Sequence, residues 1–279
     1  MSQELFTETS LKCSRLITRH YSTSFSLGIK LFSPTFRYPI YGIYGFVRYA
    51  DEIVDTFHDY NKQELLQRFR NDTYKAIEDK ISLNPILNSF QKIVHEYCIE
   101  QELIDAFLDS MEMDLHDLQY NQELYRKYIY GSAEVVGLMC LKVFCERDDS
   151  RYQKLQLPAR SLGAAFQKVN FLRDINSDFV DRGRTYFPGV NLQEFSFQDK
   201  AQIEADIQKD FEKAREGILE LPSGAKVGVY LAYIYYLKLF KKIRRLEASL
   251  ILSKRIRIPN LIKISLLLRT IFLSRLRVI

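Results

Sequence analysis

The feature that most constrains this chain is the stretch from Tyr44 to Asp55, where charged side chains recur at helical spacing among apolar ones. Residues three and four positions apart share a helix face, so Tyr44, Arg48, Asp51 and Asp55 line one side of the predicted helix. Two carboxylates at this spacing repel each other, and in apolar surroundings they need a cation. Mg²⁺ takes one or two protein carboxylates and completes its shell with water and phosphate oxygens, so it fits this need. Glu52 lies about 100° round the helix from Asp51 and is left out of the ligand set.

A second stretch, which ends at Pro188, repeats the pattern. Four polar residues at spacings of three, four and four share one helix face: Gln167, Asn170, Asp174 and Asp178. Two such helices facing each other across a cavity would present their carboxylates to metal ions that bridge to a diphosphate. Arginines near both stretches would add charge-assisted hydrogen bonds to phosphate oxygens: Arg48, Arg173 and Arg184. For either stretch alone a solvated acidic face is the alternative, but the aromatic surroundings and the presence of both favour a site.

The rest of the chain favours helix. It has only seven Pro and 11 Gly among 279 residues, and we find no strand-like alternation, repeat or linker. Asn61 with Glu64 forms a capping-box signal, and Asn84 before Pro85 marks another helix start. We therefore predict an all-α fold with one domain over residues 1–279, in which 22–26 and 182–197 are loops. The predicted helices are 2–19, 34–57, 62–79, 85–98, 101–118, 121–145, 158–181, 198–220, 225–252 and 260–276.

Cysteine and histidine usage indicates reduced thiols in a cytoplasmic protein. The four cysteines form no CxxC pair and the four histidines show no ligand spacing, which argues against a zinc site. The first residues are polar and include Glu4 and Glu8, so no signal peptide is evident. No run reaches the ~18 uninterrupted apolar residues that a membrane span needs.

Charge is concentrated in a C-terminal segment, residues 254–279. No acidic residue follows Glu247, while seven of the 40 basic residues do, so the rest of the chain has 33 basic residues against 35 acidic ones. One interpretation is a last helix that packs on the body with its basic residues outward. Another is peripheral contact with an anionic membrane on its inner face. Arg255 can also reach a substrate diphosphate, whereas nucleic-acid binding is disfavoured because no stacking platform accompanies the charge.

The two polar stretches and their surroundings resemble the squalene/phytoene synthase family of head-to-head prenyl transferases, over about residues 20–260. The family's Arg-x-x-Asp-x-x-x-Asp motif is matched by Arg48, Asp51 and Asp55. Its later motif, Gln-x-x-Asn-x-x-Arg-Asp-x-x-x-Asp followed by Arg-x-Tyr-x-Pro, is matched by Gln167, Asn170, Arg173, Asp174, Asp178, Arg184, Tyr186 and Pro188. Its early Ser-x-Ser-Phe and central Tyr-x-Tyr-Gly segments are matched by Ser22, Ser24, Phe25, Tyr128, Tyr130 and Gly131. Residues 255–259 resemble the end of bacterial phytoene synthases, and one departure is Glu134, where the family commonly has Gly.

The resemblance implies an isoprenoid-synthase-type helical bundle around a central cavity, with one trans-isoprenyl diphosphate synthase-like catalytic domain. It implies Mg²⁺ or Mn²⁺ as cofactor, held by Asp51, Asp55, Asn170, Asp174 and Asp178. The same four aspartates, with Tyr44 and Tyr128, are the implied catalytic residues. The implied substrate-binding residues are Ser22, Phe25, Arg48, Gln167, Asn170, Arg173, Arg184, Tyr186 and Arg255. Phe25, Tyr44, Tyr128 and Tyr186 are candidates for cation–π contact with a carbocation, with plain core packing as the alternative for each.

The implied reaction is Mg²⁺-dependent condensation of two geranylgeranyl diphosphates to phytoene through a cyclopropyl diphosphate, a step of carotenoid biosynthesis. Squalene or dehydrosqualene formation from farnesyl diphosphate is the alternative within the family. A non-catalytic relative that serves in assembly is another, although all four motif aspartates are present. One-substrate terpene cyclases share the fold but carry different metal motifs.

Overall fold

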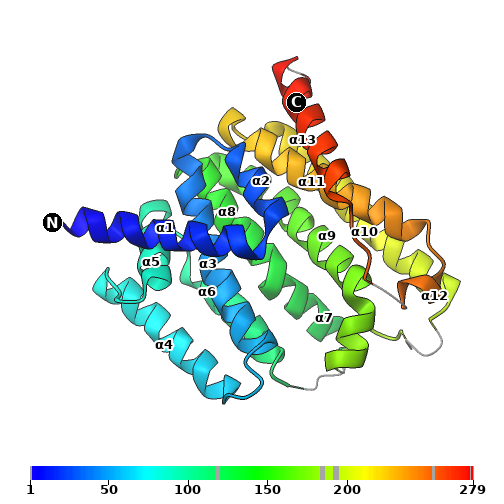
Figure 1. The fold of residues 1–279 in the computed structure, drawn as a ribbon, viewed down its shortest axis with the longest axis horizontal. Coiled ribbons are helices and arrows are strands. Elements are labelled where there is room, and N and C mark those ends of the chain that lie inside the picture. Colours follow the sequence, from blue (N-terminus) through cyan, green and yellow to red (C-terminus); the bar gives the residue numbers. More distant parts are fainter. Residues whose placement is uncertain are drawn as a thin grey trace.

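The computed structural model describes residues 2–116, 120–182, 186–190, 195–252, 255–276 and 278, with the side chains of the longest helix described as far as Asn176. Helices and no strands form within these residues, which confirms the all-α prediction (Figure 1). The helices are α1 (Gln3–Tyr21), α2 (Thr23–Lys30), α3 (Pro34–Asp55), α4 (Lys62–Asp79), α5 (Pro85–Tyr97), α6 (Gln101–Met113), α7 (Gln122–Ile129), the π-helical turn η1 (Tyr130–Glu134), α8 (Val135–Cys145), α9 (Asp149–Arg182), α10 (Phe197–Glu220), α11 (Ser223–Arg244), α12 (Ala248–Ile251) and α13 (Asn260–Arg275).

The helices form a bundle in which α4 and α5 lie on one side and α10, α11 and α13 lie on the other (Figure 1). Apolar side chains are buried in two adjoining clusters. One cluster is built mainly on α3, α5, α6 and α8, and the second mainly on α9, α10 and α11. Val229 of α11 packs against both clusters, so the two clusters adjoin. The helix α3 belongs to the first cluster and most of α9 to the second, so the two polar stretches lie on opposite halves of the interior. The assignment of the whole chain to one domain stays a prediction.

The predicted capping signals start the helices as expected. Asn61 accepts a hydrogen bond from the backbone N–H of Glu64 at 3.2 Å. Asn84 accepts from the backbone N–H groups of Ile86 and Leu87 at 3.0 and 3.4 Å. These side chains satisfy donors that the first turn of a helix leaves without intrahelical partners.

The prediction of a loop over residues 22–26 is wrong, because these residues begin α2. Ser22 is the N-cap of this helix, and its hydroxyl accepts a hydrogen bond from the backbone N–H of Phe25 at 3.2 Å. The hydroxyl-rich sequence therefore starts a helix, which fits the preference of Ser for N-cap positions. This cap fixes where α2 begins and so places Phe25 in its first turn.

The start predicted for the second polar helix is also wrong, because α9 begins at Asp149 and Pro158 lies inside it. The side chain of Asp148 accepts a hydrogen bond from the backbone N–H of Arg151 at 3.0 Å, which caps the earlier start. Pro158 packs closely against Gly217 of α10, where an added Cβ would lie 2.2 Å from the proline Cβ. The stabilisation from packing α9 on α10 thus outweighs the cost of the backbone hydrogen bond that proline removes from the helix. The predicted stop signal, Gly183, lies outside the described residues.

Two other predicted helices are subdivided. The helix predicted over 121–145 contains the π-helical turn η1, and the one predicted over 225–252 ends at Arg244 and is followed by α12. Within the described residues, the run Gln122–Cys145 is long and apolar enough by composition to cross a membrane. Because 67% of its most apolar window is buried inside the bundle, we interpret it as a core helix.

Candidate functional site

An apolar cavity of about 260 Å³ lies inside the bundle. Its walls come from α2, α3, η1, α8, α9, α10 and α11. The helices α2 and α11 approach closely beside it, because a Cβ on Gly228 would lie 2.6 Å from the carbonyl oxygen of Gly28. Apolar side chains predominate, and Phe25, Ile29, Phe32, Val136, Cys140, Phe144, Leu162, Phe166, Val229 and Ala232 are among them.

The cavity also has polar lining residues, and these are connected by hydrogen bonds. Ser132, Gln167, Asn170 and Tyr236 all contribute to the wall. The amide of Gln167 donates to the Ser132 hydroxyl at 3.3 Å, and the amide of Asn170 donates to Oε1 of Gln167 at 3.4 Å. The hydroxyl of Tyr236 donates to Oδ1 of Asn170 at 3.3 Å. The sequence-predicted residues Gln167 and Asn170 are therefore brought together at the cavity, on α9.

One turn beyond Asn170, the carboxylate of Asp174 is surrounded by guanidinium groups. Arg173 donates to it through Nε and Nη2, with distances of 3.0 and 2.5 Å to its two oxygens. Nε of Arg255, beyond α12, lies 2.8 Å from Oδ1. Burial is the largest single influence on the pKa of Arg173 and lowers it, but the hydrogen bond to Asp174 and the nearby Asp174 and tyrosine groups together outweigh burial, so the net pKa is raised. The structure thus gathers three predicted residues, one acid and two bases, at one point.

On α3, Arg48 organises the other polar stripe. Its guanidinium pairs with Glu52, lies 3.9 Å from Oδ2 of Asp51, and stacks over the ring of Tyr21 at 4.4 Å. Within the described structure, Nε of Arg48 is buried and has no hydrogen-bond acceptor. A buried guanidinium donor that lacks an acceptor suits an anionic ligand such as a diphosphate. Glu52 is not in the predicted ligand set, and the structure gives it another part, because its carboxylate pairs with the guanidinium of Arg48.

Aromatic side chains connect the α3 and α9 stripes. The ring of Phe25 lies 5.7 Å from that of Tyr44 on α3 and 6.4 Å from that of Tyr236 on α11, and Tyr236 bonds Asn170 on α9. Burial raises the pKa of Tyr44 to about 12, although Arg48 opposes this shift. Burial also raises the pKa of Tyr236, so both hydroxyls stay protonated at neutral pH. Phe25 lines the cavity itself, as a residue for cation–π contact must.

Tyr128 and Tyr186 lie together in a neighbouring aromatic cluster and are not among the cavity-lining residues. The hydroxyl of Tyr128 donates to Asp114 at 2.8 Å, and that of Tyr186 donates to the same carboxylate at 3.3 Å. Phe171 of α9 stacks on Tyr186 with a centroid distance of 4.1 Å. Burial raises the pKa of Tyr128 well above its usual value, so its hydroxyl is a hydrogen-bond donor. Their candidate contact with a carbocation stays a prediction.

Glu134 lies in η1 and points to an ion pair rather than to the cavity. Its Oε2 is 2.6 Å from Nε of Arg160 on α9, whose guanidinium lies 5.2 Å from the ring of Tyr130. The neighbouring Ala133 and Val136 line the cavity, but Glu134 does not. The departure from the family pattern at this position thus has a local, structural explanation.

The ligand chemistry of the site fits a hard divalent cation. Asp51 and Asp55 on α3, and Asn170 and Asp174 on α9, offer carboxylate and amide oxygens, which Mg²⁺ and Mn²⁺ accept. The two guanidinium groups on Asp174 show that this carboxylate already requires positive charge beside it. Among the described side chains, no group of three or more His, Cys, Asp or Glu residues comes together.

Two predicted site residues are not placed. Arg184 and the side chain of Asp178 lie outside what the structure describes. Three residues that the sequence analysis did not predict belong to the surroundings of the site: Asp114, Tyr236 and Glu52. Tyr236 and Asp114 carry no spacing signal that could have identified them, because their partners are distant in sequence. Glu52 is four residues from Arg48, which is a signal for an ion pair on one helix face.

A helical bundle with an apolar cavity between its helices, and acidic helices beside the polar lining of that cavity, defines a fold of the prenyltransferase type. The chain belongs to the squalene/phytoene synthase family, whose profile matches residues 18–261.

Individual relatives agree with this assignment. Phytoene synthase 1 of Solanum lycopersicum is 28% identical over 86% of this chain and 62% of its own length. The 4,4'-diapophytoene synthase of Staphylococcus haemolyticus is 27% identical over 70% of this chain and 67% of its own length. The chain thus spans less than two thirds of some relatives that it matches.

Solved structures confirm the fold. A dehydrosqualene synthase in complex with ligand superposes with a TM-score of 0.81, 20% identity and 98% coverage of both chains. Squalene synthase HpnC from Alicyclobacillus acidocaldarius gives a TM-score of 0.75 at 20% identity, covering 86% of this chain and 94% of the other.

Proposed function

We propose that this protein condenses two molecules of geranylgeranyl diphosphate head to head to give phytoene, through a cyclopropyl diphosphate intermediate, in carotenoid biosynthesis. The observation that carries the proposal is the apolar cavity whose wall includes Gln167 and Asn170, one helical turn from Asp174 and its two arginines. A prenyl diphosphate has a long apolar chain and a strongly anionic end. The apolar cavity suits the chain, and the arginines beside it suit the diphosphate. Several of the relatives are phytoene synthases, which supports the same reaction.

The residues around the cavity have defined parts in this reaction. Arg48, Arg173 and Arg255 hold diphosphate oxygens by charge-assisted hydrogen bonds. The apolar wall excludes water from the allylic cation, and Phe25 faces it with an aromatic ring. Tyr44 and Tyr236 keep their protons at neutral pH, so they act as hydrogen-bond donors and not as bases.

The carbon chemistry then proceeds in two ionisations. An allylic C–O bond breaks and diphosphate leaves with the electron pair; the double bond of the second substrate attacks the cation, and loss of a proton closes the cyclopropane ring. The cyclopropyl diphosphate ionises in turn, rearranges and loses a second proton. Two diphosphates and two protons leave in all, so formation of phytoene needs no reductant.

Mg²⁺, with Mn²⁺ as an alternative, would be held by Asp51, Asp55, Asn170, Asp174 and Asp178. The chemistry that such a cation supplies is neutralisation of the charge on the departing diphosphate. The hard oxygen donors of the two helices support this choice.

Formation of dehydrosqualene or squalene from farnesyl diphosphate is the second candidate. It is favoured by the likeness to a diapophytoene synthase over 67% of that protein's length, and by the modest cavity volume of about 260 Å³. Squalene differs from the other two products because its formation needs a hydride donor.

Incubation with Mg²⁺ and either geranylgeranyl or farnesyl diphosphate, with and without NADPH, tests these candidates by product mass. A C40 triene-containing hydrocarbon from the longer substrate, formed without NADPH, is expected. Products from farnesyl diphosphate alone would favour the second candidate, and absence of any hydrocarbon from either substrate would contradict both.

We also propose a cytoplasmic location with peripheral contact to a membrane. All four cysteines are free thiols in the structure, which supports a reducing compartment. The substrates and product are strongly apolar, so access to a bilayer would serve the reaction.

A further inference from the structure

The outer face of α13 differs from the rest of the surface. Exposed large apolar side chains are scattered elsewhere but recur along this helix at spacings of three and four residues, so they share one face. Leu268 is 62% exposed and Phe272 is 61% exposed. The members of this apolar stripe are Leu261, Ile264, Leu268, Phe272 and Leu276.

The opposite face of α13 accounts for its attachment to the body. This face packs on α11, where Thr270 is fully buried and Lys263 lies over the ring of Tyr235 at 5.3 Å. In Figure 1, α13 crosses α11, the helix that it contacts, near the C-terminal end of the chain. The apolar stripe therefore is not needed to hold α13 on the protein.

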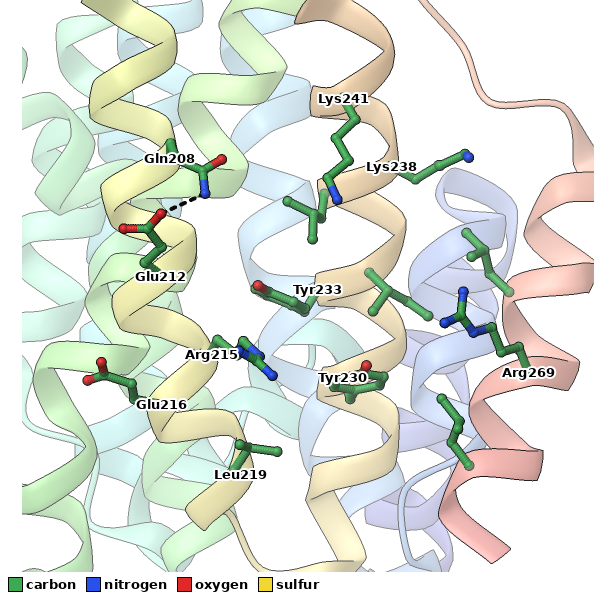
Figure 2. A pocket seen from close by; sticks show the side chains of 14 residues that line it. Gln208, Glu212, Arg215, Glu216, Leu219, Tyr230, Tyr233, Lys238, Lys241 and Arg269 are labelled. Atoms are coloured by element: carbon green, nitrogen blue, oxygen red, sulfur yellow. Dashed lines mark hydrogen bonds between the residues drawn. The ribbon is translucent and has the colours of Figure 1, made fainter. Parts of the chain in front are cut away.

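Positive charge accompanies the apolar stripe. Arg269 and Arg275 are exposed beside it, and no acidic residue occurs after Glu247. Figure 2 shows the groove between α10 and α13, about 860 Å³ in volume, with Arg269 on α13 and Lys238 on α11 near that helix, while Glu212 and Glu216 lie on the α10 wall. The α10 wall is mixed, because Arg215 lies with the two acids, whereas the groove lining that α11 and α13 contribute has basic residues and no acidic ones.

We propose that the apolar stripe of α13 is a docking surface for an anionic lipid bilayer. An apolar helix face with arginines beside it inserts into the boundary between headgroups and acyl chains, and its cations pair with anionic headgroups. Charge favours a bilayer over a second copy of this chain, because two copies meeting through this face would bring arginine against arginine. The inference rests on the membrane contact proposed above and deepens it, because it assigns that contact to one face of α13.

Docking through α13 would bring the bilayer near the candidate site. The segment that leads into this helix passes the site, because Arg255, five residues before Asn260, pairs with Asp174 at 2.8 Å. The chain then reaches the membrane-facing helix through residues 256–259. A protein held in this way would take up and release apolar molecules beside the lipid phase.

Co-sedimentation of the full-length protein with vesicles tests the proposal. Wild type is expected to bind vesicles of equimolar phosphatidylcholine and phosphatidylglycerol, and to bind phosphatidylcholine alone more weakly. The double variant L268E/F272E should lose roughly tenfold or more of its vesicle affinity, because it places two charges in the inserted face. R269Q/R275Q should weaken binding to the anionic vesicles by about fivefold per arginine and reduce its dependence on salt.

The matched control is L83E/L157E, which replaces two leucines elsewhere that are more exposed than Leu268 and Phe272, at 92% and 70%, and it should bind as wild type does. Circular dichroism confirms that each variant is folded, and light scattering reports oligomeric state. Wild-type protein that binds neither vesicle, or L268E/F272E that binds as tightly as wild type, would overturn the proposal. A wild-type dimer that L268E/F272E converts to monomer would also overturn it, since a second copy would then cover the stripe.

Discussion

Nε of Arg255 lies 2.8 Å from Oδ1 of Asp174, although 81 positions separate the two residues in sequence. The same carboxylate is held by Arg173, its neighbour on α9. A partly buried carboxylate at the edge of an apolar cavity requires positive charge, and here guanidinium groups provide it. A divalent cation bound at Asp174 would compete with, or share the carboxylate with, these arginines.

Replacement of Arg255 by Gln is therefore expected to have two opposite effects. Mn²⁺ should bind the substrate-free protein a few-fold more tightly, because the competing ion pair is open to solvent on its Arg255 side and is worth roughly 0.2–1 kcal/mol. Turnover should fall, because a contact to diphosphate is lost. Mn²⁺ titration followed by electron paramagnetic resonance measures the first effect, and product formation the second. Arg257→Gln, two residues away, serves as the control, and unchanged Mn²⁺ affinity in Arg255→Gln would contradict the competition.

Asp51→Asn, Asp55→Asn, Asp174→Asn and Asp178→Asn should each lower turnover roughly 10²- to 10³-fold, the range seen when one electrostatic contact to a developing charge is removed. The helical circular dichroism should be retained, because the side chains keep their size. Asp72→Asn, on the exposed surface of α4, is the control. Near-normal turnover in the four site variants would remove the metal-ligand assignment.

Ala232→Phe tests which prenyl chain the cavity receives. Ala232 lines the cavity on α11, so a phenyl ring there shortens the space available to substrate. We expect turnover of geranylgeranyl diphosphate to fall roughly tenfold or more, with a smaller loss for farnesyl diphosphate. Ala232→Val should have a weaker effect in the same direction. Equal losses for both substrates, measured by product mass, would argue against the cavity as the chain-binding site.

Glu134→Gln should reduce stability and leave the product unchanged. The Glu134–Arg160 pair joins η1 to α9 at 2.6 Å, and Arg160 is partly exposed, so the pair contributes about 0.2–1 kcal/mol. Urea unfolding of Glu134→Gln, Arg160→Gln and the double variant measures the coupling. A change in product mass or double-bond pattern in Glu134→Gln would show instead that this residue shapes the cavity.

Tyr44→Phe should change the response of stability to alkaline pH. Burial raises the pKa of Tyr44 from 10.0 to about 12 in the folded protein, so the neutral phenol stabilises the fold fully below pH 10. This contribution is lost as pH rises through about 12. The difference in unfolding free energy between wild type and Tyr44→Phe should therefore be constant below pH 10 and shrink above it. A constant difference across the whole range, measured by urea unfolding, would refute the shift.

Local patterns were sufficient for most of the fold and for part of the site. The caps at Asn61 and Asn84 act within their own first turns, so the sequence predicted these helix starts correctly. The spacing of Gln167, Asn170 and Asp174 needs only helical geometry, and the structure places all three on α9. The start of α9 was mispredicted because Pro158 is accommodated by Gly217 of another helix, a contact that no local pattern contains.

The sequence by itself determined that this protein is helical and carries two polar helix faces, because caps and helical periodicity depend on residues within a few positions. Only the tertiary structure decided that Tyr236 bonds Asn170, that Asp114 joins Tyr128 to Tyr186, and that Arg255 returns to Asp174. These pairs join residues on different elements, and their partners are set by how the helices pack around the cavity.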